Sequence, residues 1–161
     1  MRILYIHGLL SKPNLGRMAH LEERGHTVFA LHINYMSQPD CYAILREHAV
    51  ENGVNYIIGS SFGGYLGFWL AEELGIPCLL FNPAMRLEKY KGLIPLEIER
   101  KCPKRFVVIG AQDDTVLPEI GWDFFGRTEN QAPYQRVIQC QWLGHRFDMD
   151  TFEGMVRWVG L

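Results

Sequence analysis

The amino-acid sequence predicts one α/β domain, a three-layer α/β/α sandwich built around a mainly parallel six-stranded sheet. Six short apolar runs alternate with longer segments of helical character, which is the pattern of strand–helix–strand units. The runs are apolar throughout rather than alternating with polar residues, which indicates that helices cover both faces of the sheet. No repeat, low-complexity tract or linker interrupts the sequence, so residues 1–161 are expected to form a single domain.

Local signals set the limits of each expected element in chain order. Gly25 ends the first helix, Asp40 caps the second, and Gly53 follows the end of that second helix. Phe152 and Val156 lie on one face of the last helix. The expected strands are residues 3–6, 27–31, 56–58, 78–81, 105–110 and 135–140. The expected helices are residues 14–24, 41–51, 64–74, 119–125 and 149–159.

One segment, residues 84–103, has no clear periodicity and contains two prolines. We expect it to form loops with one or two short helices above the functional site, and hence little or no cap. Four positive charges gather at its end, and we expect them to form a solvated loop at the entrance of the fifth strand. These four residues are Arg100, Lys101, Lys104 and Arg105.

Composition excludes several classes of function. The formal net charge of −2 offers no electrostatic attraction to nucleic acid or to an anionic membrane. No run of residues is apolar enough to span a bilayer, and the start of the chain does not resemble a secretory signal. The four cysteines are scattered, with no pair or neighbouring histidine at metal-ligand spacing. We therefore expect a cytoplasmic, reduced and metal-free protein without a nucleic-acid or membrane partner.

The strongest chemical signal is Gly59-x-Ser61-x-Gly63, placed between an apolar strand and an apolar helix. This is the arrangement of a nucleophile elbow, in which a sharp turn holds a serine hydroxyl clear of the sheet. The turn is crowded, and glycines two residues before and after the serine supply the necessary room. The same pentapeptide also occurs as an ordinary glycine-serine turn before a helix, so the remaining residues must decide. We take Ser61 as the candidate nucleophile.

A serine nucleophile needs a base and a carboxylate that orients the base. His145 is the candidate base among six histidines, because it follows the last strand on the loop that enters the final helix. The acid is expected after the fifth strand, where Asp113 and Asp114 are adjacent. Pro118, four residues after Asp114, favours Asp114, whereas counting three residues on from the end of the strand favours Asp113. We prefer Asp114 and keep Asp113 as the second choice.

An oxyanion hole needs two backbone N–H groups beside the nucleophile. The expected donors are Phe62, directly after Ser61, and Leu9, in the loop after the first strand. Gly8 and Leu10 in the same loop, together with Tyr65, are the candidate substrate-binding residues.

Taken together, these residues resemble the α/β-hydrolase superfamily, and more closely the small YqiA-like esterases of bacteria. The resemblance runs through nearly the whole chain and includes an acid block, Asp114-Thr115-Val116-Leu117, that agrees with Asp114. The other blocks are Tyr5-Ile6-His7-Gly8-Leu9, Gly59-Ser60-Ser61-Phe62-Gly63-Gly64-Tyr65, Asn82-Pro83-Ala84-Met85-Arg86 and Gly144-His145-Arg146-Phe147. It implies a compact α/β-hydrolase fold with strand order 2-1-3-4-5-6, hydrolysis of short-chain acyl esters, and no cofactor.

Three functions remain open at this point. The first is an esterase that acts on a small-molecule acyl ester through an acyl-enzyme intermediate. A thioesterase or small-amide hydrolase would use the same residues. A catalytically idle α/β-hydrolase fold that acts as a protein-binding module is the alternative of a different class.

Overall fold

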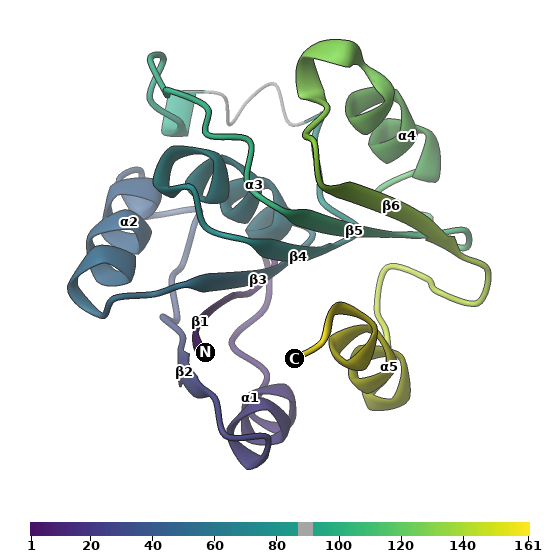
Figure 1. Cartoon of the computed structure of the whole chain (residues 1–161), viewed down its shortest axis with the longest axis horizontal. Helices are drawn as coiled ribbons and strands as arrows, with labels where there is room; N and C mark the ends of the chain where they lie inside the picture. Colours follow the sequence, from purple (N-terminus) through teal and green to yellow (C-terminus); the bar gives the residue numbers. More distant parts are fainter. Residues whose placement is uncertain (87–91) are drawn as a thin grey trace.

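The computed structural model describes residues 1–86 and 92–161 and contains one six-stranded sheet. Every neighbouring pair of strands is parallel, and the strand order is β2-β1-β3-β4-β5-β6 (Figure 1). The strands are β1 (Arg2–Ile6), β2 (Thr27–Phe29), β3 (Tyr56–Ser60), β4 (Cys78–Phe81), β5 (Arg105–Gly110) and β6 (Gln135–Cys140). The predicted sheet and its strand order are confirmed.

The described residues form five α-helices at the positions expected from the sequence; four of them connect strands, and the fifth follows the last strand. They are α1 (Leu15–Glu23), α2 (Cys41–Glu51), α3 (Phe62–Leu74), α4 (Pro118–Gly126) and α5 (Met149–Val159), with a short 3₁₀ helix η2 (Thr128–Asn130) after α4. Helix α3 begins at Phe62, two residues earlier than expected, because the sharp turn at Ser61 leads directly into it. Strand β2 ends at Phe29, since the chain leaves the sheet edge there.

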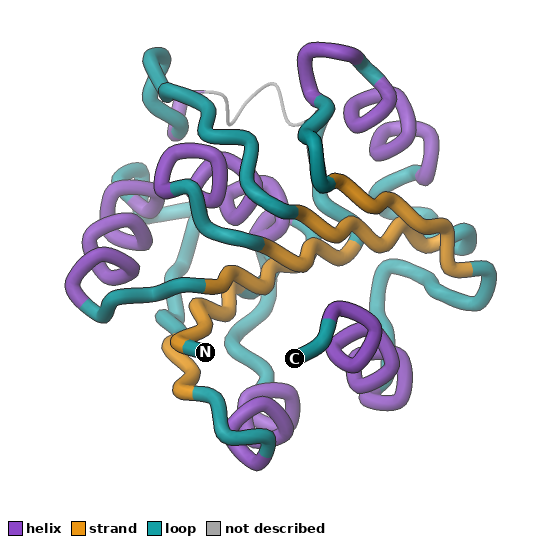
Figure 2. Tube along the Cα trace, in the orientation of Figure 1, coloured by secondary structure: helices purple, strands orange, loops and turns teal. Residues whose placement is uncertain are grey.

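The sheet forms the middle layer, with helices on both faces. Helices α2, α3 and α4 lie on one face, and α1 and α5 lie on the other (Figures 1 and 2). Strand side chains alternate between the two cores: Ile57 packs with the α3 side and Ile58 with the α5 side. Both are almost completely buried, which explains why the strands are apolar on both faces.

The segment between β4 and β5 includes residues 84–103, for which the least specific structure was predicted. Residues 87–91 lie outside the described residues. In the described parts, 84–86 and 92–103, the chain forms loops and turns with a 3₁₀ stretch at residues 92–93 and no α-helix. None of the described helices is both long enough and apolar enough to cross a bilayer.

The basic cluster at the entrance of β5 is not uniformly solvated, contrary to the sequence expectation. Arg105 is fully buried, donates to the carboxylate of Glu72 from α3, and donates to the Asn130 carbonyl at 2.9 Å. Arg100 also donates to Glu72, at 3.2 Å. A buried carboxylate needs such partners. The two arginines therefore pair with Glu72 near the start of β5 and do not form an exposed binding patch.

Candidate active site

The turn between β3 and α3 has the geometry of a nucleophile elbow. Ser61 adopts φ 54° and ψ −121°, a conformation that non-glycine residues rarely adopt. A Cβ on Gly59 would lie 2.4 Å from the Gly63 carbonyl oxygen, and one on Gly63 would lie 2.3 Å from the Ile6 carbonyl oxygen. Only glycine fits at either position. The two glycines therefore let α3 pack directly against the backbone of β1 and β3.

Neighbouring main chain holds Ser61 on both sides. The Ser61 N–H donates to the Phe81 carbonyl at 2.9 Å, and the Ser61 carbonyl accepts from the Ala84 N–H at 3.1 Å. Gly8 lies against the serine: a Cβ on Gly8 would be 3.5 Å from the Ser61 Cβ. Ser61 is therefore only partly exposed, beside the loop that follows β1.

In that loop, three donors fix the carbonyl of Gly8. It accepts from His7 Nδ1 at 2.8 Å, from Ser11 Oγ at 3.0 Å and from the Ser11 N–H at 3.3 Å. Because a trans peptide points its carbonyl and its N–H in opposite directions, these bonds also fix the direction of the Leu9 N–H. Among the described residues, that N–H has no hydrogen-bond acceptor. Leu9 is thus able to serve as a backbone donor.

His7 itself is a buried structural residue with a defined tautomer. Its Nε2 accepts from the Ile33 N–H at 3.2 Å, so the ring proton resides on Nδ1 and is donated to Gly8. The Tyr35 hydroxyl donates to the His7 carbonyl at 3.1 Å. Burial lowers the pKa of His7, with a further contribution from nearby His32. The imidazole therefore remains neutral and rigid at neutral pH.

His145 is paired with Asp113 at the ends of β6 and β5. The ring donates from Nδ1 to Asp113 Oδ2 at 2.9 Å and approaches Oδ1 at 3.1 Å. Burial alone would raise the pKa of Asp113, but hydrogen bonds from His145, Val116 and Thr115 outweigh it and hold the pKa below the ordinary value. An ionised Asp113 keeps the proton of His145 on Nδ1, which leaves Nε2 free to accept a proton.

The choice of Asp114 over Asp113 is not supported by this geometry. The Asp113 side chain is fully buried, and its Oδ1 accepts from the N–H groups of Thr115 and Val116 at 2.9 and 2.8 Å. This turn directs its carboxylate toward His145 and leaves Asp114 exposed. Among the described residues, Asp114 accepts only from the Thr115 hydroxyl, at 3.2 Å. Local sequence does not show which aspartate forms this turn, because either carboxylate could accept from the N–H groups two and three residues later.

The His145 loop must cross part of the sheet to approach the elbow. Strands β3 and β6 are three positions apart in the sheet, or about 14 Å at the usual interstrand spacing. The loop after β6 returns to β4: Phe147 stacks on Phe81 with ring centroids 4.5 Å apart, and the Gly144 carbonyl accepts from Asn82 Nδ2 at 2.8 Å. Sequence reasoning assigned no role to Asn82 in the site. The described residues include no hydrogen bond between Ser61 and His145, and such bonds often form only when substrate is present.

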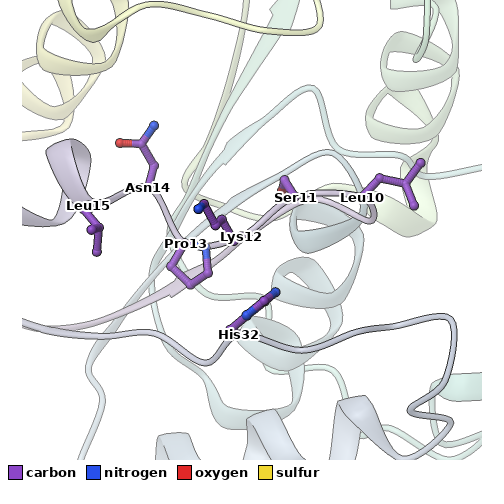
Figure 3. A pocket seen from close by; sticks show the side chains of 7 residues that line it. All are labelled: Leu10, Ser11, Lys12, Pro13, Asn14, Leu15 and His32. Carbon is purple, nitrogen blue, oxygen red and sulfur yellow. The ribbon is translucent and has the colours of Figure 1, made fainter.

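One cavity borders the loop after β1, and another borders helix α3. The larger one, about 580 Å³, lies between the loop after β1 and the segment after β2 that carries His32 (Figure 3). Leu10, one of the predicted substrate-binding residues, lies on its border and is 89% exposed. The second, about 350 Å³, is mainly apolar and includes Tyr65, Trp69 and Met85 in its lining. Tyr65 is one helical turn beyond Ser61, which places this cavity on the α3 side of the elbow.

Phe62, the other expected oxyanion donor, is the first residue of α3 and is 1% exposed. Main-chain N–H groups in the first turn of a helix have no partner within the helix and carry its positive end. The described residues contain no cluster of three or more His, Cys, Asp or Glu side chains that could hold a metal ion.

The fold is shared with solved hydrolases at low sequence identity. A monoacylglycerol lipase from Paleococcus ferrophilus aligns with a TM-score of 0.78 and 14% identity, over 98% of this chain and 93% of that one. Est1E from Butyrivibrio proteoclasticus, solved with ferulic acid bound, aligns with a TM-score of 0.75 and 14% identity, over 98% of this chain and 87% of that one. Acyl-protein thioesterase 2 from Zea mays aligns with a TM-score of 0.67 and 13% identity, over 98% of this chain and 91% of that one. At these identities the likeness establishes the α/β-hydrolase fold.

A family model covers the elbow and Asn82 but ends before Asp113 and His145. It matches residues 2–107, more than half of the 161 residues, and bears the description "uncharacterised protein family (UPF0227)". The chain belongs to this family, and its fold is that of the α/β hydrolases.

Proposed function

We propose that this protein is a serine hydrolase that cleaves short-chain acyl esters, with Ser61 as nucleophile, His145 as base and Asp113 as the orienting acid. The observation that carries the proposal is the combination of a strained serine at a glycine-packed turn with a His–Asp pair at the carboxyl edge of the same sheet. The α/β-hydrolase fold and its esterase, lipase and thioesterase examples support a hydrolase in general.

In the proposed reaction, His145 Nε2 takes the Ser61 hydroxyl proton while Oγ attacks the ester carbonyl carbon. The Leu9 and Phe62 N–H groups stabilise the negative oxygen of the tetrahedral intermediate. The proton then passes from His145 to the departing alkoxide, and the acyl group remains on Ser61. A water molecule, deprotonated by His145, attacks the acyl-enzyme and restores the serine. The balance closes with an acid and an alcohol as products, and no cofactor takes part in these steps.

The apolar cavity beside Tyr65 supports an acyl substrate of limited size. Its volume of about 350 Å³ is near the lower end of small-molecule sites, and its lining is mostly aliphatic and aromatic. Gly8 leaves space directly against Ser61, where a side chain would narrow the approach of a carbonyl group. We therefore assign Gly8 and Tyr65 to substrate binding near the reacting carbon, and Leu10 to the border of the larger cavity, beside the loop after β1.

The decisive experiment is covalent labelling of the purified protein with a fluorophosphonate, followed by intact-mass measurement. We expect a single adduct on the wild type that is lost in Ser61→Ala and strongly slowed in His145→Ala. Ester turnover by Ser61→Ala should fall by about three orders of magnitude or more. Ser60→Ala is the matched control, because it removes the neighbouring hydroxyl and should leave labelling intact.

The same experiment separates the alternatives. A folded wild-type protein that takes no adduct would overturn the hydrolase proposal and favour the binding module. If the adduct forms, paired thioester, amide and ester substrates with the same acyl group distinguish the esterase from a thioesterase or amide hydrolase. A kcat/KM at least tenfold higher for the ester is the expected result.

A further inference from the structure

Asn82 is a buried polar residue at the end of β4, between the elbow and the His–Asp pair. It is 3% exposed, and its φ of 44° lies in the left-handed region. Its N–H continues the sheet by donating to the Val108 carbonyl at 2.8 Å. The chain thus bends sharply at Asn82 while it remains attached to β5. Asparagine tolerates this conformation better than most residues do, but its side chain is not needed for the bend alone.

Both polar atoms of the Asn82 side chain are used. Oδ1 accepts from the Gly110 N–H at 2.7 Å, and Nδ2 donates to the Gly144 carbonyl at 2.8 Å. The partners settle which atom is oxygen and which is nitrogen, because an N–H can only donate and a carbonyl can only accept. One planar amide therefore joins the last residue of β5 to the residue before His145.

These two contacts lie next to both members of the His–Asp pair. Gly110 is three residues before Asp113, and the Asp113 N–H donates to the Gly110 carbonyl at 3.3 Å. Gly144 directly precedes His145. On the other side, Phe81, the residue before Asn82, accepts from the Ser61 N–H. The Asn82 amide therefore connects the strand that holds Ser61 to the His145 loop, alongside a main-chain hydrogen bond from the Gln112 N–H to the Leu143 carbonyl at 2.9 Å.

We infer that Asn82 is a positioning residue that holds the His145 loop over the end of β4, within reach of Ser61. The inference rests on the proposed role of His145 as the base. The Phe81–Phe147 stack also holds the loop on β4, but ring stacking restrains the direction of a main chain less strictly than a hydrogen bond. Loss of the Asn82 amide should therefore leave the loop in place and let His145 move away from the productive orientation.

Two variants test this role. Asn82→Gly keeps the positive φ and removes both hydrogen bonds, whereas Asn82→Asp keeps the acceptor for the Gly110 N–H and replaces the donor to Gly144 with a negatively charged acceptor. Cys102→Gly is the matched control, because Cys102 also has a positive φ, 46°, and lies before the amino-terminal end of β5. Circular dichroism identifies a variant that fails to fold. If one Asn82 variant does not fold, the kinetics of the other Asn82 variant test the positioning role.

We expect kcat for a small ester to fall about a hundredfold in both Asn82 variants, the effect of misplacing a reacting group by about 1 Å. KM should change by less than about threefold, since the substrate-binding residues are untouched. Phosphonate labelling should slow in parallel. Cys102→Gly should retain wild-type kcat even if its melting temperature changes. Lower melting temperatures with unchanged kcat in folded Asn82 variants would overturn the positioning role.

A spectroscopic readout separates this inference from the proposed catalysis. The His145 Nδ1 proton shared with Asp113 should give a downfield NMR resonance, assigned by its loss in His145→Ala. We expect that resonance to shift or disappear in Asn82→Gly and Asn82→Asp and to persist in Cys102→Gly. This result would support the positioning role even if the wild type hydrolysed no ester. An unchanged resonance in both Asn82 variants would overturn it.

Discussion

The two halves of the carboxyl edge of the sheet are built by different means. The elbow half comprises residues 7–11 and 59–63, and the acid–base half comprises residues 82, 110–117 and 141–148. In the elbow half, main chain packs on main chain so closely that a Cβ on Gly63 would lie 2.3 Å from a carbonyl oxygen. The acid–base half has one such contact, where a Cβ on Gly110 would lie 2.4 Å from the Leu143 carbonyl oxygen, but its functional side chains are placed by hydrogen bonds among carboxylate, imidazole and amide groups.

This difference determines how each half tolerates change. A close main-chain contact leaves no space for an added atom, so substitution there acts on the fold itself. A hydrogen-bonded side chain can be replaced by a similar shape with different chemistry, so substitution there acts first on orientation and charge. The elbow half is therefore expected to fail by unfolding, and the acid–base half by loss of activity in a folded protein.

The largest expected effect comes from Asp113→Asn, which keeps the shape of the side chain and removes its charge. Without the carboxylate, His145 no longer favours the tautomer with its proton on Nδ1, and kcat should fall by about 10⁴-fold. Asp114→Asn is the matched variant: it is exposed, so its effect should stay within about twofold. Steady-state kinetics of the two proteins side by side provide the test. Equal losses in both, or a larger loss in Asp114→Asn, would restore Asp114 as the acid.

The next effect is on stability and belongs to the elbow half. Gly63→Ala would force a methyl group against the carbonyl oxygens of Ile6 and His7, which belong to main chain and cannot turn away. We expect a loss of about 3 kcal/mol or more in the free energy of unfolding, measured by urea denaturation. Gly154→Ala, in α5, meets no atom within 4 Å and should be neutral or stabilising by up to about 1 kcal/mol. A Gly63→Ala protein as stable as Gly154→Ala would refute the close packing.

The smallest expected effect is a dependence of the free energy of unfolding on pH, which differs between His7 in the elbow half and Asp113 in the acid–base half. The pKa of His7 is lowered in the folded protein, so the unfolded chain binds a proton there more readily. The neutral imidazole stabilises the fold fully above the unfolded-state value of about 6.5, and this contribution is lost as the pH falls through the lower folded-state value. The Asp113 carboxylate, whose pKa is also lowered, stays ionised until more acidic pH.

Urea midpoints measured from about pH 8 to pH 5 detect this difference. We expect the wild type to lose stability on acidification more steeply than His7→Gln, whose side chain does not titrate. If the urea midpoints of the wild type and His7→Gln changed with pH in parallel, His7 protonation would contribute nothing to the stability of the fold.

Much of the fold and part of the candidate site could be predicted from the sequence. Continuous apolar runs indicated six buried parallel strands. The spacing of Gly59, Ser61 and Gly63 indicated the turn, because main chain that packs this closely permits only glycine. The register of the acid could not be obtained in this way. It depends on which carboxylate binds the N–H groups of Thr115 and Val116, and both aspartates have the same chemistry.

The role of Asn82 could not be predicted from the sequence for a related reason. An asparagine before a proline is typical of a strand end, and nothing in the local pattern shows that its amide reaches Gly110 and Gly144, 28 and 62 residues away. Arg105 was misjudged similarly, because its buried partner Glu72 lies on another element. Long-range polar contacts of this kind are not visible in local sequence.

The contact of Gly63 with β1 also has a dynamic consequence. Ser61 is fixed in the same rigid body as the central strands, so it cannot follow a substrate whose carbonyl binds slightly out of place. His145 is carried by a loop that a stacked ring and one amide attach to β4, and this attachment allows small movements. In the proposed reaction, adjustment to substrates of different size would therefore fall to His145, while Ser61 would keep a fixed position.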